Sequence, residues 1–176
     1  LPDPYAGGIG AEGVKALQQF VEEGGTLVAM DSSSMLPIQD FNIPVRNVLE
    51  GVRPDQFSCP GSILKLRVEV THPVAYGMPQ EAAAYFAQGP AFATSVPGAG
   101  QARAVIARYP DEPLLLSGWI HGEALLKKRA AAVEVSMGKG RVILLGLRVQ
   151  HRSQTHGTFK LLFNAIHYGA SEPATP

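Results

Sequence analysis

The chain has 176 residues, of which 45% are hydrophobic and 17% charged, a composition that suits one folded domain with a buried core. Lysine plus arginine and aspartate plus glutamate each total 15, so no net charge attracts nucleic acid or an anionic membrane. The single cysteine, Cys59, excludes an internal disulfide and a zinc site built from several thiolates. We therefore expect no nucleic-acid partner, no membrane partner and no metal site in this chain.

The first segment predicts a helix followed by a strand. The helix begins at Gly10 and ends before Gly24, which can adopt the left-handed conformation that stops a helix. Its apolar residues recur at helical spacing: Val14, Leu17, Phe20 and Val21. Residues 26–30 (TLVAM) are then apolar on both faces, which predicts a buried strand in a parallel sheet covered by helices.

The middle of the chain predicts one short helix and several strands. Within residues 37–51, Pro44 can occupy the first turn of a helix that runs through Val48 and Leu49. Residues 62–70 (SILKLRVEV) alternate apolar and polar side chains, as a strand with one wet face does. Shorter strands are expected at residues 91–94, 102–108 and 114–117.

The last third predicts a hairpin and a helix. Residues 131–135 and 141–145 are joined through residues 138–140 (GKG), where glycine can adopt a positive φ. The helix begins near Thr158, a candidate N-cap, and ends before Gly169. Its predicted buried face consists of Phe159, Leu162, Phe163 and Ile166.

The order of these elements predicts one layered α/β domain over residues 1–169, followed by a disordered tail at residues 170–176. The chain opens with a loop that leads straight into a helix, so no preceding strand–helix unit supplies neighbours for the strand at residues 26–30. We therefore interpret the sequence as part of a larger protein.

Three segments resemble a class I glutamine amidotransferase-like domain. They are GIGAEGVKALQQFVEEGGTLVAMDSSS, FSCPGSILKLRVEVTHPVAYGMP and GKGRVILLGLRVQHRSQTHGTFKLLFNAI. More closely, they resemble the version appended to the carboxyl end of bacterial carboxypeptidase A-like zinc peptidases, in which a loop like CPGS and a closing segment like QHRSQTHGTFKLLFNA recur. The resemblance implies a flavodoxin-like, three-layer αβα sandwich whose first strands precede Leu1. It also implies an exported parent, periplasmic or extracellular, whose zinc belongs to the peptidase domain; we expect no cofactor here.

The resemblance also locates a catalytic site that has changed. In active members, a strand ends in a sharp elbow that carries a nucleophilic cysteine, and a later strand is followed by a histidine and an acid. By this match Ser32 replaces the cysteine, His151 keeps the place of the base, and Ser153 replaces the acid. A glutaminase needs a thiolate to attack the amide carbon, and Cys59 lies far from the elbow in sequence. We therefore favour a noncatalytic structural or binding domain.

The expected partner of such a domain is the upstream peptidase domain of the same protein, or a second copy of this chain, because a sheet edge left open by a missing strand is normally covered. Whether this chain is itself an enzyme stays open. The alternative is a serine hydrolase acting on small peptides or amides, with Ser32 as nucleophile and His151 as base. Against it, Asp31 and Ser33 crowd the elbow, and hydroxyls after a strand more often cap the next helix.

A third hypothesis is a sensor that binds an anion. Arg148 and Arg152 follow a strand at the sheet edge where open α/β sheets bind ligands, and Asp31 and Ser33 are expected at the same edge. The arginines can equally well pair with Asp31 or a glutamate and serve the fold alone. A zinc site at His151 and His156 is less favoured, because the segment around them contains no carboxylate to complete a ligand set.

Overall fold

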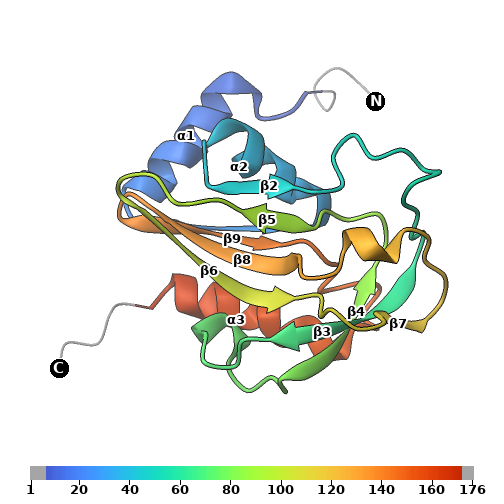
Figure 1. The fold of residues 1–176 in the computed structure, drawn as a ribbon. Helices are drawn as coiled ribbons and strands as arrows, with labels where there is room; N and C mark the ends of the chain where they lie inside the picture. The colour runs from blue at the N-terminus through green and yellow to red at the C-terminus, as the bar shows by residue number, and fades with distance from the viewer. Residues whose placement is uncertain (1–6, 172–176) are drawn as a thin grey trace.

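The computed structural model describes residues 7–171, which form a mixed sheet between helices (Figure 1). The α-helices are α1 (Gly10–Glu22), α2 (Met35–Asp40) and α3 (Phe159–Gly169). The strands are β1 (Thr26–Met30), β2 (Val45–Asn47), β3 (Ser62–Val68), β4 (Glu81–Phe86), β5 (Phe92–Thr94), β6 (Gln101–Arg108), β7 (Leu115–Ser117), β8 (Ala130–Met137) and β9 (Gly140–Leu145). Short 3₁₀ turns are η2 (Asp31–Ser34), η3 (Pro73–Ala75), η4 (Glu123–Leu125) and η5 (His156–Thr158). Within residues 7–171, no helix is both long and apolar enough to cross a bilayer.

The sheet has the strand order β1-β9-β8-β6-β3-β4, with β2, β5 and β7 attached beside this path. Only β1 and β9 run parallel, with Thr26 opposite Arg141, and the remaining pairs are antiparallel. The expectation of a mainly parallel sheet is therefore wrong. The β8–β9 turn, for example, is too short for a crossover connection and can only give an antiparallel pair.

Helices cover both faces of the sheet, which gives the three-layer α/β sandwich expected from the sequence (Figure 1). The side chains of β9 alternate between two buried clusters. Val142 and Leu144 pack with Val21 of α1, whereas Ile143 and Leu145 pack with the residues under α3. All four β9 side chains are fully buried, so this one strand is shared by both cores.

The strand β1 is present where the sequence predicted it, but it lies at the end of the sheet. Its only strand partner within residues 7–171 is β9. Ala29 is buried, while Leu27 and Val28 are half-buried and pack against opposite cores. The predicted burial on both faces is therefore partial, because the outer edge of β1 has no neighbouring strand among the described residues.

Two elements between β1 and β6 differ from the sequence-based expectation. The helix predicted after Pro44 is absent: the helix α2 ends at Asp40, and Val45 instead pairs with Thr94 of β5. Proline fits α2 because Pro37 lies in its first turn, where a backbone N–H has no partner in the helix. The strand β4 was not predicted, since its sequence EAAAYF is rich in alanine, and pairing with β3 overrides that weak preference.

The helix α3 has the predicted position but not the predicted buried face. Leu161 and Ala165, one turn apart, are buried, whereas Phe163 and Ile166 are 55% and 54% exposed. The helix is apolar on several sides, so periodicity alone does not select a face. Asn164 fixes the orientation, because its side-chain amide donates hydrogen bonds to the carbonyls of Val74 and Tyr76.

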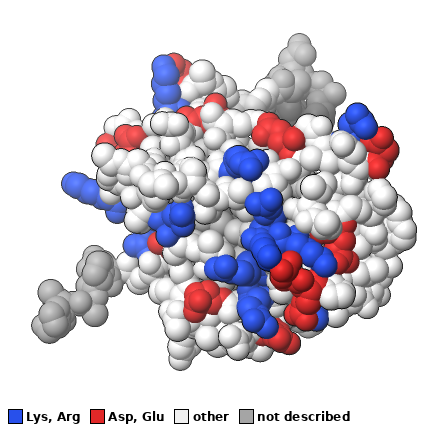
Figure 2. Space-filling view, in the orientation of Figure 1, with Lys and Arg blue, Asp and Glu red and all other residues white. Residues whose placement is uncertain are grey.

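Residues 172–176 lie outside the described residues, so the predicted tail stays a prediction, and the same holds for the opening loop at residues 1–6. Charged side chains of both signs are scattered over the face drawn in Figure 2. Figure 2 shows Lys and Arg side chains gathered near the middle of the face where β5, β6 and β8 meet.

The predicted β8–β9 hairpin is confirmed, and its glycines have two separate roles. Gly138 has a φ of +58°, a conformation that favours glycine. Gly140 lies where the hairpin meets the end of α1, and a Cβ placed on it would overlap the carbonyl oxygens of Val21 and Gly25. Gly138 also contributes, since a Cβ there would lie 2.6 Å from the carbonyl oxygen of Glu22, so the hairpin approaches α1 this closely because neither glycine has a side chain.

We expect Gly140→Ala to lower the free energy of unfolding by about 3 kcal/mol, because the new methyl group displaces backbone rather than a flexible side chain. Urea denaturation measures this loss. Gly157→Ala is the matched control, since no heavy atom lies within 4 Å of a Cβ at that position. Its effect should stay below about 0.5 kcal/mol, and equal losses for the two variants would show that the close approach to α1 is unimportant.

Candidate functional site

The carboxyl ends of the parallel strands β1 and β9 meet at one edge of the sheet. Asp31 follows β1 directly, and Arg148 lies three residues after the end of β9. The Nε of Arg148 donates a hydrogen bond of 2.9 Å to Oδ2 of Asp31. The side chains of Arg148 and Asp31 are 38% and 25% exposed, so the ion pair is partly shielded from water. The structure thus brings together two of the predicted site residues.

Asp31 also has an unusual backbone. Its φ is +51°, in the left-handed region that costs most residues about 1–2 kcal/mol and that aspartate tolerates better than most. The turn after β1 is therefore sharp, as the resemblance implied. The match placed the altered nucleophile at Ser32, but the residue with the left-handed backbone is its neighbour Asp31.

The space beside the Asp31 carboxylate is filled by the segment that precedes β5. A Cβ placed on Gly89 would stand 2.9 Å from Oδ1 of Asp31 and 2.7 Å from the carbonyl oxygen of Gly146. The backbone of Gly89 therefore packs directly onto the ion pair. The preceding residue, Gln88, has a φ of +56°, which turns the chain into this position.

Ser32 and Ser33 lie exposed on η2. The expectation that a hydroxyl here caps the next helix is wrong, because no side-chain cap is formed at the start of η2 or α2. The buried hydroxyl of Ser34 instead donates to the carbonyl of Ala29 across the turn, at 3.3 Å. This bond holds η2 against the end of β1 and leaves the hydroxyls of Ser32 and Ser33 on the surface.

His151 lies in a different environment from Ser32. Its ring packs against Tyr85, with 4.6 Å between ring centroids and 30° between planes. It lines a cavity of about 530 Å³ together with Tyr85 and residues 154–157, and Ser32 is not part of that lining. Among the described residues, no hydrogen bond joins either Ser32 or Ser33 to His151.

Arg152, the second predicted anion ligand, is exposed and has a φ of +48°. Within residues 7–171 it forms no ion pair.

Sequence reasoning missed the residue that organises this loop, which is Thr155. Its hydroxyl donates to the carbonyl of Val149 at 2.9 Å and accepts from the backbone N–H of His151 at 3.1 Å. Hydroxyl side chains in loops often form hydrogen bonds to nearby backbone groups, so the threonine in this polar loop was the sequence signal that could have identified it.

Thr158 occupies the predicted N-cap position of α3 without capping it through its side chain. Its hydroxyl donates a hydrogen bond to the carbonyl of Val149 at 3.0 Å instead, as the hydroxyl of Thr155 also does.

The predicted zinc alternative involved His156, whose Nε2 lies 2.7 Å from the carbonyl oxygen of Ser153. Within the part of the chain that the structure describes, no three His, Cys, Asp or Glu side chains are grouped so as to hold a metal ion.

Cys59 is fully buried, and its Sγ lies 3.8 Å from the carbonyl oxygen of Phe86. Burial raises the pKa of this thiol, so little thiolate forms at neutral pH. The hydroxyl of Tyr109 is also fully buried and has no hydrogen-bond partner among the described residues. Burial raises the pKa of Tyr109 strongly, and the charges of Cys59 and Asp31 add to that effect. Neither group is prepared to act as a nucleophile.

No family model matches the chain, and no curated protein matches it. Solved structures do resemble it. A candidate GMP synthase component from Thermoplasma acidophilum has a TM-score of 0.53 at 8% identity, over 90% of this chain and 65% of that one. A candidate ThuA-like protein from Bacteroides uniformis has a TM-score of 0.54 at 14% identity, over 92% and 65%. A cytoplasmic protein from Salmonella typhimurium has a TM-score of 0.52 at 16% identity, over 93% and 63%.

The chain has a glutamine amidotransferase-like α/β fold. The flavodoxin-like sandwich that the sequence resemblance implied is thereby confirmed. At these identities the likeness concerns the fold alone, and the chain spans about two thirds of the length of these proteins, 63% to 65%. The similarity therefore does not assign the activities of these proteins to this chain.

We expect Asp31→Asn to lower the free energy of unfolding by about 1 kcal/mol, because it removes the charge that Arg148 binds. Asparagine tolerates the left-handed backbone as well as aspartate does, so the substitution tests the charge alone. Denaturant unfolding measures the change. Asp55→Asn is the control: its pair with Arg53 is 67% and 70% exposed and should matter less. A larger loss at Asp55 would contradict a structural role for the Asp31 pair.

Proposed function

We propose that this chain is a noncatalytic amidotransferase-like domain that serves as a structural or binding module of a larger, exported protein resembling a zinc carboxypeptidase. The carboxypeptidase part of the proposal is supported by the sequence resemblance of the CPGS loop and of the closing segment around His151. Peptidase activity and zinc would belong to the other part of that protein.

The observation that carries the noncatalytic role is the closed turn after β1. In the resembling enzymes this turn exposes a cysteine to substrate. Here the residue with the left-handed backbone is Asp31, its carboxylate is bound by Arg148, and Gly89 covers it at a distance that leaves no room for a methyl group. A nucleophilic reaction needs an activated group, a base within hydrogen-bond reach and an open space for the substrate. Asp31 is an anion already paired with a cation.

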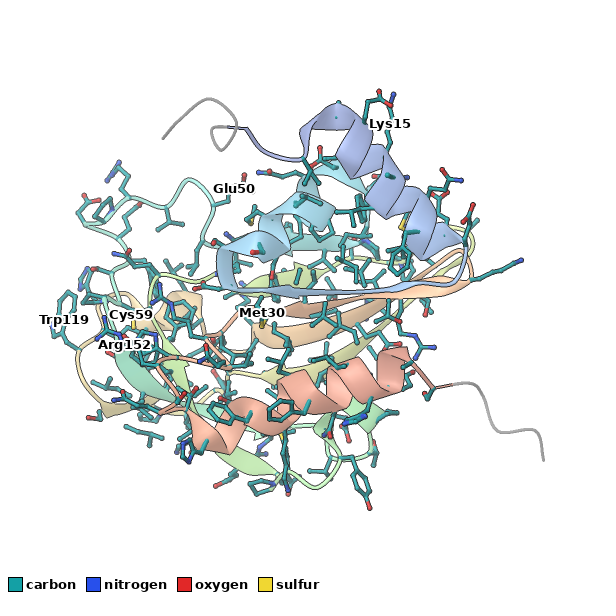
Figure 3. The ribbon with its side chains drawn as sticks, turned by 180° about the vertical axis from the view of Figure 1, so that it is seen from behind. Lys15, Met30, Glu50, Cys59, Trp119 and Arg152 are labelled. Atoms are coloured by element: carbon teal, nitrogen blue, oxygen red, sulfur yellow. The ribbon has the colours of Figure 1, made fainter. Side chains whose placement is uncertain are left out.

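The exposed edge of β1 supports the proposal of a partner. Figure 3 shows β1 between α1 and α3, with Met30 at its end. Large apolar side chains are exposed on the two helices that contact β1, with Phe20 at 52% on α1 and Phe163 and Ile166 at 55% and 54% on α3. An unpaired strand flanked by exposed apolar residues favours association with another strand and its covering layer. We propose the preceding region of the same protein as the partner, with a second copy taking its place in the isolated chain.

The noncatalytic role is tested with a fluorophosphonate probe, which labels activated serine hydroxyls. We expect no labelling of the folded chain above that of the unfolded chain, because no base among residues 7–171 is hydrogen-bonded to the Ser32 hydroxyl. The probe is applied in parallel to Ser32→Ala and Ser33→Ala, which remove two neighbouring exposed hydroxyls. Labelling of the parent chain that is lost only in Ser32→Ala would establish the serine hydrolase instead.

The proposal that the open edge of β1 binds a partner is tested by analytical ultracentrifugation of the isolated chain. We expect self-association that increases with concentration, and we expect Phe163→Lys with Ile166→Lys to weaken it, because the lysines replace exposed apolar side chains of α3 with charge. Val96→Lys is the control, since Val96 is 87% exposed but lies in the loop after β5. A chain that stays monomeric at its highest soluble concentration would argue against the proposed edge interface.

A further inference from the structure

A second candidate site lies away from the Asp31 turn, in a cavity of about 340 Å³ where β5, β6 and the start of β8 meet. Four of its lining residues are cationic and none is acidic: Arg103, Arg108, Lys128 and Arg129. The whole chain carries equal numbers of positive and negative residues, so four cations around one cavity are a strong local excess of positive charge.

The backbone fixes three of these cations relative to one another. The N–H of Tyr109 donates to the carbonyl of Arg129, and the N–H of Lys128 donates to the carbonyl of Tyr109, both at 2.9 Å. Arg108 is paired with Ala130 in the β6–β8 ladder. The two chain segments that present the cations are therefore joined by hydrogen bonds before any ligand arrives, which lowers the entropic cost of binding.

Most of this positive charge is not neutralised within the chain. Arg103, Arg108 and Arg129 form no ion pair with any carboxylate of residues 7–171. The Nε of Arg103 donates to the carbonyl of Ser95 at 2.6 Å, which holds the guanidinium at the cavity and leaves its terminal nitrogens available. Lys128 pairs with Asp111 at 2.7 Å, but these side chains are 71% and 62% exposed, so water screens that pair.

Two features of the cluster have an unfavourable energy, and a bound anion would offset the second. Lys128 has a φ of +63°, a conformation that a long side chain adopts only at a cost. Arg108 lies directly opposite Arg67 in the β3–β6 pair, and like charges in that position repel. Arg67 bonds to Glu81 at 3.3 Å on its far side, and Arg108 forms no ion pair among residues 7–171. Hydrogen bonds lower the pKa of the exposed Glu69, and the charge of Arg108 contributes to that lowering.

We infer that this cavity binds a compact oxyanion with two or more negative charges, of the phosphate-ester or polycarboxylate class. Guanidinium groups match the geometry of phosphate and carboxylate oxygens and can bind them through paired hydrogen bonds. The volume of about 340 Å³ is at the lower end of the range for small-molecule sites. The site is independent of the proposed noncatalytic role, since it shares no residue with the turn at Asp31.

The test is calorimetric titration of the chain with pyrophosphate at low ionic strength, and with citrate in a separate titration. We expect saturable binding of at least one of the two, and we expect Arg108→Gln and Arg129→Gln each to weaken it about tenfold or more, the effect of one lost charge-assisted contact. Binding of pyrophosphate alone would assign the phosphate class, and binding of citrate alone the polycarboxylate class.

Two variants separate binding from folding. Lys128→Gly removes the ammonium and relieves the left-handed backbone, so it should weaken binding while leaving the unfolding free energy unchanged or higher. Asp111→Asn removes the competing carboxylate and should tighten binding several-fold. Arg53→Gln is the control for net charge, because Arg53 pairs with Asp55 and does not line the cavity.

The inference is overturned if neither anion shows saturable binding up to about 10 mM, which is weaker than a site with several charged contacts should be. It is also overturned if Arg53→Gln weakens binding as much as Arg108→Gln does, since the attraction would then be a diffuse effect of charge. These failures leave the proposed noncatalytic role untouched, because that role is measured by serine labelling.

Discussion

The ion pair between Asp31 and Arg148 depends on a single constraint, the parallel pairing of β1 with β9. Parallel strands end at the same edge of a sheet, so the residues that follow them are brought together even when they are far apart in sequence. In resembling enzymes this edge is where catalysis takes place. Here the same geometry produces a carboxylate and a guanidinium that neutralise each other, and Gly89 fits against them.

The sequence predicted those elements whose pattern is set locally. The β8–β9 hairpin follows from alternating apolar residues around a glycine turn, and α1 follows from helical spacing that ends at Gly24. The strand β4 could not be predicted in this way, because alanine-rich residues become a strand only when β3 lies beside them. The buried face of α3 was mispredicted for the same reason: Asn164 selects it through carbonyls some 90 residues away in sequence, a contact that no local pattern contains.

The site was predicted in part. The sequence placed Asp31 and Arg148 at one edge of the sheet, and named their pairing as one of two alternatives. It contained no signal that Asp31 rather than Ser32 would take the left-handed backbone, or that Gly89 would cover the carboxylate, because both depend on segments distant in sequence. The cationic cavity was not anticipated either. Its residues come from β6 and from the segment before β8, and only strand pairing brings their charges together.

The position of β1 at the open end of the sheet has a consequence for how the chain acquires its structure. Among residues 7–171 β1 pairs only with β9, so within this part of the chain residues 26–30 gain a strand partner only after residues 141–145 have been synthesised. Contacts of such large sequence separation form slowly, because a long loop must be closed first. Within residues 7–171 the segment TLVAM therefore joins the sheet late, and the β8–β9 hairpin, which closes locally, provides the surface on which it docks.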